Sequence, residues 1–91
     1  MIIRIMEEGQ FDVGEDALVR LNELDAKLTQ AVESGDEVAF ADGLEMLLTD
    51  VRTGKRLPDD YLGASNLILP RVNSTLEEVR ALLGDEGLIP G

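Results

Sequence analysis

The chain opens with alternating apolar side chains that predict a short β-hairpin. Ile3 and Ile5 fall on one side of an extended segment, with Arg4 between them on the other, which is the period-two pattern of a strand with one buried face. A polar, glycine-containing stretch over residues 7–10 predicts a turn, and a second short strand follows over residues 11–13. The N-terminus is therefore predicted to form two paired strands.

Two segments with helical periodicity follow, over residues 15–34 and 37–53. Apolar residues recur in each at intervals of three and four, so each helix has one buried stripe. Between them, Gly35 suits the left-handed position after a helix, and Asp36 suits the N-cap of the next. A hairpin of antiparallel helices is predicted. The stripes consist of Ala17, Leu18, Leu21, Leu24, Leu28, Ala31 and Val32 in the first helix, and of Phe40, Leu44, Leu47, Leu48 and Val51 in the second.

The second helix carries another, smaller strip made of Ala39, Gly43 and Met46, which indicates contact on two faces. A glycine inside a helix costs about 1 kcal/mol relative to alanine, so Gly43 predicts that a neighbouring backbone comes close there. On the first helix, Asp16 and Arg20 have the spacing of a favourable i,i+4 ion pair.

The remaining chain predicts one more strand and one more helix. Residues 54–73 form a connecting region rich in Gly and Pro, with an apolar run at 67–69 that is typical of a strand. A final helix is expected to end at Gly84. Its start offers two overlapping capping boxes, Ser74 with Glu77 and Thr75 with Glu78.

These elements predict a single α+β domain over residues 1–91 with the order ββααβα. We expect two layers: a three-stranded sheet covered on one face by the helical hairpin and the C-terminal helix. The tail contains Leu88 and Ile89, and two large apolar side chains are expected to dock back on the body of the domain.

The chain contains neither cysteine nor histidine. This excludes disulfides, thiolate zinc sites, cysteine nucleophiles and histidine-based catalysis. We therefore predict a non-enzymatic protein with no catalytic, cofactor or metal site. The short apolar start lacks the features of a signal peptide, and no segment approaches the length of a membrane span, so a cytoplasmic location is expected.

Nineteen acidic residues oppose eight basic ones, giving a net charge of −11. The acids lie mainly on the predicted solvent faces of the helices, and only residues 54–73 carry more cations than anions. This balance argues against direct binding to nucleic-acid phosphates or anionic lipids. Two interpretations remain open: a surface that keeps the protein soluble, or an acidic face that docks a basic helix.

Exposed apolar residues among these acids mark a candidate contact surface. Val19 and Ala26 project from the first helix opposite its core stripe, and Val38 stands among acids at the start of the second. The full set of predicted partner contacts is Val19, Glu23, Ala26, Val38, Asp42 and Glu45.

Other acidic residues favour structural roles. Asp25 falls on the buried stripe of the first helix, so it should be a buried polar group that accepts hydrogen bonds from backbone amides or from Arg4. Asp59, Asp60 and Asp85 lie in acidic pairs that could bind a divalent cation, but their spacing does not match a known calcium loop.

Several segments, taken in order, resemble the PspA-associated proteins (PspAA), small partners of phage-shock protein A in bacterial envelope-stress systems. The resemblance implies an accessory or adaptor role beside a coiled-coil PspA-like protein, with no catalytic residue to transfer. It also implies possible recruitment to the inner face of the membrane through that partner. The segments are 1–6, 9–11, 21–25, 34–37, 57–60, 67–70, 75–79 and the ending Gly84-Asp85-Glu86-Gly87-Leu88-Ile89-Pro90-Gly91.

Two other functions are compatible with the residues. An acidic chain could act as a decoy that occupies the basic surface of a transcription regulator. A carboxylate-dependent metal enzyme using Asp59, Asp60 or Asp85 is less compatible with the sequence. A homodimer, through a sheet edge or the second strip of the middle helix, is also open.

Overall fold

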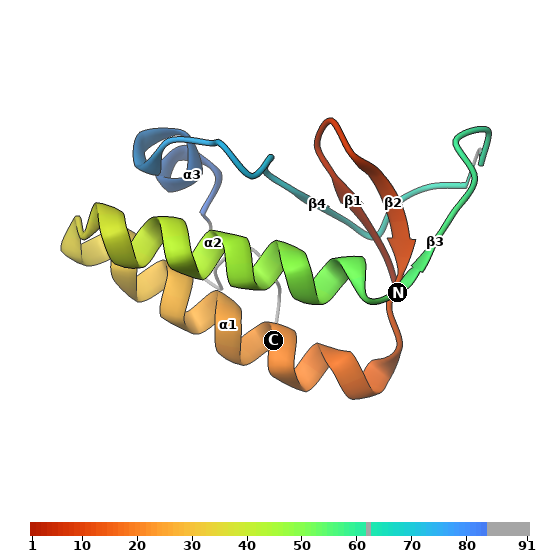
Figure 1. The fold of residues 1–91 in the computed structure, drawn as a ribbon, viewed down its shortest axis with the longest axis horizontal. Helices are drawn as coiled ribbons and strands as arrows, with labels where there is room; N and C mark the ends of the chain where they lie inside the picture. Colours follow the sequence, from red (N-terminus) through yellow and green to blue (C-terminus); the bar gives the residue numbers. More distant parts are fainter. Residues whose placement is uncertain (62, 84–91) are drawn as a thin grey trace.

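The computed structural model describes residues 1–61 and 63–83, and its elements follow the order ββααββα. It measures 38 × 25 × 21 Å, with the two long helices side by side along the longest direction (Figure 1). The elements are β1 (Ile2–Ile5), β2 (Gly9–Asp12), α1 (Glu15–Ser34), α2 (Glu37–Arg52), β3 (Lys55–Arg56), β4 (Leu67–Leu69) and α3 (Leu76–Leu82).

The sheet has four strands in the order β3-β2-β1-β4, so the predicted three-stranded sheet was wrong. β2 is antiparallel to both β1 and β3, whereas β4 is parallel to β1, which makes the sheet mixed. The missed strand is β3, where Lys55 and Arg56 are both exposed and give no apolar pattern. This strand is defined instead by its backbone hydrogen bonds to β2. The pairing extends one residue further, where the Leu57 N–H donates to the Gln10 carbonyl at 2.9 Å.

One face of the sheet packs into the core, and the other carries exposed residues beside the buried Gln10. Ile3, Ile5 and Leu69 are fully buried, whereas Arg4 and Ile68, on the opposite face, are exposed. The helical hairpin covers the buried face, as the alternation in the sequence predicted. Core side chains include Ile3, Ile5, Phe11, Val13, Leu21, Leu28, Val32, Phe40, Leu44, Leu47, Leu48, Val51, Leu69 and Val79.

The turn between the long helices forms as predicted. Gly35 adopts the left-handed conformation with φ of 72°, and its N–H donates to the Val32 carbonyl. Asp36 then caps α2, because its Oδ1 accepts the Ala39 N–H at 3.0 Å. A residue with a Cβ would be strained at Gly35, so this turn depends on glycine.

The C-terminal helix α3 begins with the capping box of Thr75 and Glu78, in which each side chain accepts the other residue's backbone N–H. It does not cover the sheet as predicted: it lies beyond the end of the sheet, near the hairpin turn (Figure 1). There it packs against α1, and Arg80 Nη2 donates to the Val32 carbonyl at 3.0 Å. The predicted docking of Leu88 and Ile89 lies outside the described residues.

Candidate protein-binding groove

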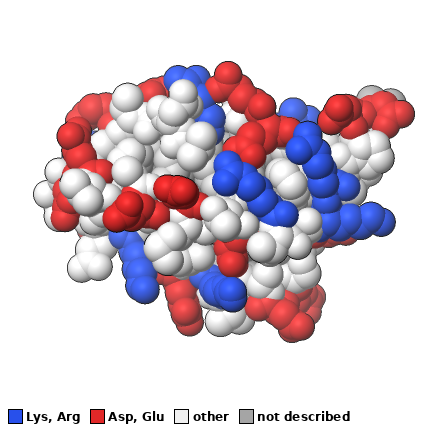
Figure 2. All heavy atoms as spheres, viewed as in Figure 1, with Lys and Arg blue, Asp and Glu red and all other residues white. Residues whose placement is uncertain are grey.

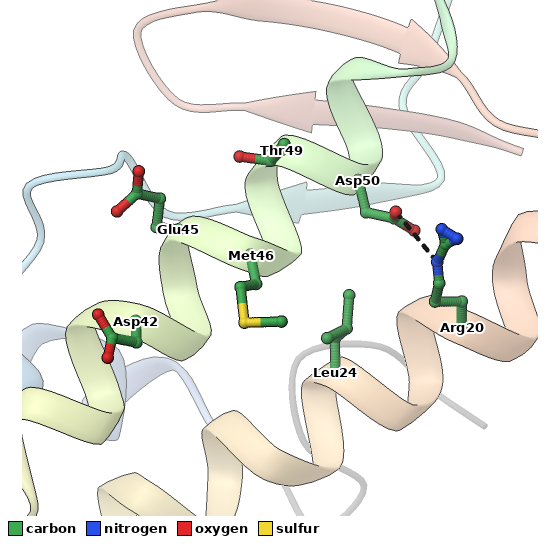
Figure 3. A pocket seen from close by; sticks show the side chains of 7 residues that line it. All are labelled: Arg20, Leu24, Asp42, Glu45, Met46, Thr49 and Asp50. Carbon is green, nitrogen blue, oxygen red and sulfur yellow. Dashed lines mark hydrogen bonds and ion pairs between the residues drawn. The ribbon is translucent and has the colours of Figure 1, made fainter.

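An open groove of about 640 Å³ lies between α1 and α2 on the side away from the sheet (Figure 3). It combines an apolar floor, one ion pair and an acidic rim. A surface of this composition can bind the side chains of another protein. Its lining residues are Arg20 and Leu24 from α1 and Asp42, Glu45, Met46, Thr49 and Asp50 from α2.

The floor is made by Leu24 and Met46, whose side chains point toward each other across the helix pair (Figure 3). Leu24 is half-buried and Met46 is 54% exposed, so both can be reached by a partner's side chains. The backbones of the two helices lie close together near this point. A Cβ added to Gly43 would lie 3.6 Å from the Leu28 Cα. The predicted close approach at Gly43 is therefore confirmed.

At one end of the groove, Arg20 of α1 forms an ion pair with Asp50 of α2, with 3.2 Å between the Arg20 Nε and Asp50 Oδ1 atoms. Arg20 therefore reaches across to α2 rather than forming the predicted ion pair with Asp16 on its own helix. Asp50 is mostly buried, with a side-chain exposure of 16%, so its carboxylate already has its partner. This pair also joins the two walls of the groove.

The other end is lined by Asp42 and Glu45, both exposed. Within the part of the chain that the structure describes, neither makes an ion pair. The Glu8 carboxylate is the main cause that raises the pKa of Arg52, and the charge of Glu45, two turns away on the same face of α2, raises it further. The rim thus presents carboxylates to solvent without a direct cationic partner among the described residues.

The groove unites only part of the predicted contact set. Asp42 and Glu45 line it, and Val38 is 74% exposed one helical turn before Asp42 on the same stripe of α2. Val19 and the exposed Glu23 lie on the back of α1, away from the groove, as does Ala26. Sequence reasoning missed Arg20, Leu24, Met46, Thr49 and Asp50. The only available signal was the second strip on α2 that contains Met46.

Asp25 is buried, with 3% exposure, as its place on the apolar stripe predicted. Arg4 was one of the two kinds of partner expected for it, the other being backbone amides. The side chain of Arg4 lies on the open face of β1, opposite Ile3 and Ile5, whereas α1 packs against the buried face. Asp25 is buried in the core and is not among the residues that line the groove.

The acidic loop residues do not assemble into a metal site in the described part of the chain. Asp59 lies 3.8 Å from Arg56 Nη2 and is 94% exposed, and Asp60 is exposed as well. Residues 1–61 and 63–83 contain no group of three acidic side chains placed to hold a metal ion. Asp85, the third candidate, lies outside the described residues.

Cations and acids are distributed unevenly over the surface. On the face shown in Figure 2, Lys and Arg gather toward the C-terminal end of α2 and β3, whereas carboxylates lie over the middle of α2 beside uncharged atoms. At the cationic end, Arg52 donates two hydrogen bonds to Glu8, of 2.7 and 2.6 Å, which lower the pKa of the Glu8 carboxyl. None of the described helices is long and apolar enough to cross a membrane.

A family model described as PspAA, PspA-Associated protein, matches residues 1–91. The match includes the ending over residues 84–91, one of the segments on which the resemblance was based. No curated protein and no solved structure matched the chain. The name of this family denotes association with PspA.

Proposed function

Because the chain belongs to the PspA-associated protein family over its whole length, we propose that it is a non-enzymatic accessory protein that binds a PspA-like protein. The family match is the observation that carries this proposal. The protein acts in the cytoplasm as part of the envelope-stress response, and it reaches the inner face of the membrane through its partner.

The chemistry of the chain supports a binding role. With neither cysteine nor histidine, it lacks thiol nucleophiles and the imidazole that most often acts as a general base. The groove between α1 and α2 offers what protein recognition uses: exposed apolar side chains at its floor and charged groups at its rim. A net charge of −11 favours a partner surface that carries Lys and Arg.

Isothermal titration calorimetry with the PspA-like protein encoded in the same genome tests the proposal. We expect saturable binding at low ionic strength that weakens as salt is added, because salt screens exposed charges. An unrelated coiled-coil protein of similar net charge provides the specificity control. Absence of binding at low ionic strength, or equal binding to the unrelated coiled coil, would contradict the proposed function.

A further inference from the structure

The outer wall of the groove belongs to a helical stripe that extends past the lining residues to Val38. Val38, Asp42, Glu45 and Thr49 follow one another at intervals of four, three and four residues on α2, and all are exposed. At 1.5 Å per residue this stripe is about 16 Å long, equal to about three turns of a helix lying beside it. Met46 lies next to the stripe, on the side that faces α1 (Figure 3).

From this arrangement we propose that the groove binds one amphipathic helix of the PspA-like partner, with apolar residues on one face and Lys or Arg beside them. The inference rests on the proposed function and specifies the surface and the partner's chemistry. Two apolar side chains three or four residues apart on the partner helix pack on Leu24 and Met46. Helices that bind in grooves commonly use this spacing.

Charge complementarity selects a cationic helix. Asp50 is paired with Arg20, so the carboxylates available to a partner are those of Asp42 and Glu45. Lys or Arg side chains of the bound helix lie against these two acids while its apolar residues cover the floor. An anionic lipid or nucleic-acid surface would be repelled by the same rim.

Variants at exposed positions test the groove without disturbing the core. Replacing Asp42 and Glu45 together by lysine reverses the rim charge, and Met46→Ser removes the apolar contact. Each exposed ion pair contributes up to about fivefold in affinity, so losing both pairs costs up to about 25-fold; because the reversal also adds repulsion, the double variant should weaken binding by about 25-fold. Met46→Ser should weaken binding about tenfold.

Matched controls lie on the back of α1. The double variant Glu23→Lys with Glu33→Lys makes the same change in net charge at two exposed positions outside the groove. Val19→Ser removes an apolar side chain that is 65% exposed and was a predicted contact. If the groove is the site, each control should change affinity by less than about threefold.

The measurement is calorimetric titration of each variant with the full-length PspA-like protein, with circular dichroism melts to show that all variants fold. The neutral pair Asp42→Asn with Glu45→Gln provides a second test with less perturbation, and should weaken binding about 2- to 25-fold. Partner binding that survives all groove variants unchanged would overturn the inference and leave the proposed function intact. Failure of the wild-type chain to bind would overturn both.

Two further outcomes also decide against the inference. If the back-face controls lose affinity while the groove variants retain it, the contact lies on α1 around Val19. If sedimentation shows a wild-type dimer that Asp42→Lys with Glu45→Lys dissociates, the groove holds a second copy of this chain. Loss of partner binding in the groove variants, with a monomeric wild type and unchanged controls, is the result we expect.

Discussion

The contact between Glu8 and Arg52 allows a quantitative test of how the sheet is fixed to the helix that forms the groove. Glu8 lies in the turn between β1 and β2, and Arg52 is the last residue of α2. Arg52 Nε and Nη2 donate to the two carboxylate oxygens at 2.7 and 2.6 Å. Glu8→Gln removes the charge and leaves the size of the side chain almost unchanged.

The expected loss lies between the values for exposed and buried pairs. Fully exposed ion pairs contribute at most about 1 kcal/mol, and hydrogen bonds to charged groups contribute about 1.5–3 kcal/mol. The side chains are 27% and 33% exposed, for Glu8 and Arg52 respectively, so a loss of about 1–2 kcal/mol is expected for Glu8→Gln. In a domain of this size that corresponds to a fall in Tm of about 5–12 °C.

The loss should depend on pH in a defined direction. The hydrogen bonds from Arg52 lower the pKa of Glu8 in the folded state below that of the unfolded chain. A lowered carboxyl pKa stabilises the folded state above the unfolded value, about 4.3, and this contribution disappears as the pH falls through the folded value. The difference between wild type and Glu8→Gln should therefore be full at pH 7 and should shrink below about pH 4.

Thermal melts at pH 7 and at several acid pH values measure this difference, and a double-mutant cycle with Arg52→Gln isolates the pair. The neighbouring Glu7→Gln is the matched control, because Glu7 and Arg71 are 3.3 Å apart but more exposed, at 65% and 43%. We expect less than about 0.5 kcal/mol there. A coupling energy near zero at pH 7, or an equal loss at all pH values, would refute the reasoning.

Three further substitutions have effects that follow from local geometry, each measurable by chemical denaturation. Gly43→Ala should stabilise the protein by about 0.5–1 kcal/mol, because the new Cβ lies at an ordinary distance from Leu28 and alanine favours a helix; a loss would contradict this. Gly54→Ala should destabilise it by more than 1 kcal/mol, because its Cβ would lie 2.7 Å from the Asp12 carbonyl oxygen; a neutral effect would show that β3 shifts freely. Thr75→Ala should cost about 1 kcal/mol by removing the cap of α3, and Thr75→Ser should retain most of it.

The elements with strong periodicity were predictable, and those defined by backbone pairing alone were not. α1 and α2 follow from apolar stripes and from the Gly35 and Asp36 turn, which the structure confirms. β3 could not be found in the same way, because Lys55 and Arg56 are charged and exposed. Charged side chains are typical of a short edge strand, because they discourage pairing with other chains. The same charged residues give no apolar pattern, so β3 could not be recognised in the sequence.

The groove was only partly predictable for a related reason. The spacing of Asp42 and Glu45 places them on the solvent side of one helix, but a sequence does not give the distance from there to α1. That distance depends on how closely the helices pack around Gly43 and Leu28. Met46 was visible as part of a second strip. Leu24 was assigned to the core stripe, and it does pack against the core, but it is half-buried and also forms part of the groove floor.

The overall negative charge of the chain should affect the association rate of the partner, whereas contacts in the groove should affect its dissociation rate. Charges anywhere on the chain attract a cationic partner and raise the association rate, an effect that salt suppresses. Contacts on Leu24 and Met46 form only after docking, so they determine how slowly the partner leaves. Stopped-flow measurements should therefore show slower association for Glu23→Lys with Glu33→Lys and faster dissociation for Met46→Ser. Equal effects of both variants on dissociation would place the contact outside the groove, because a back-face charge change should leave a docked helix undisturbed.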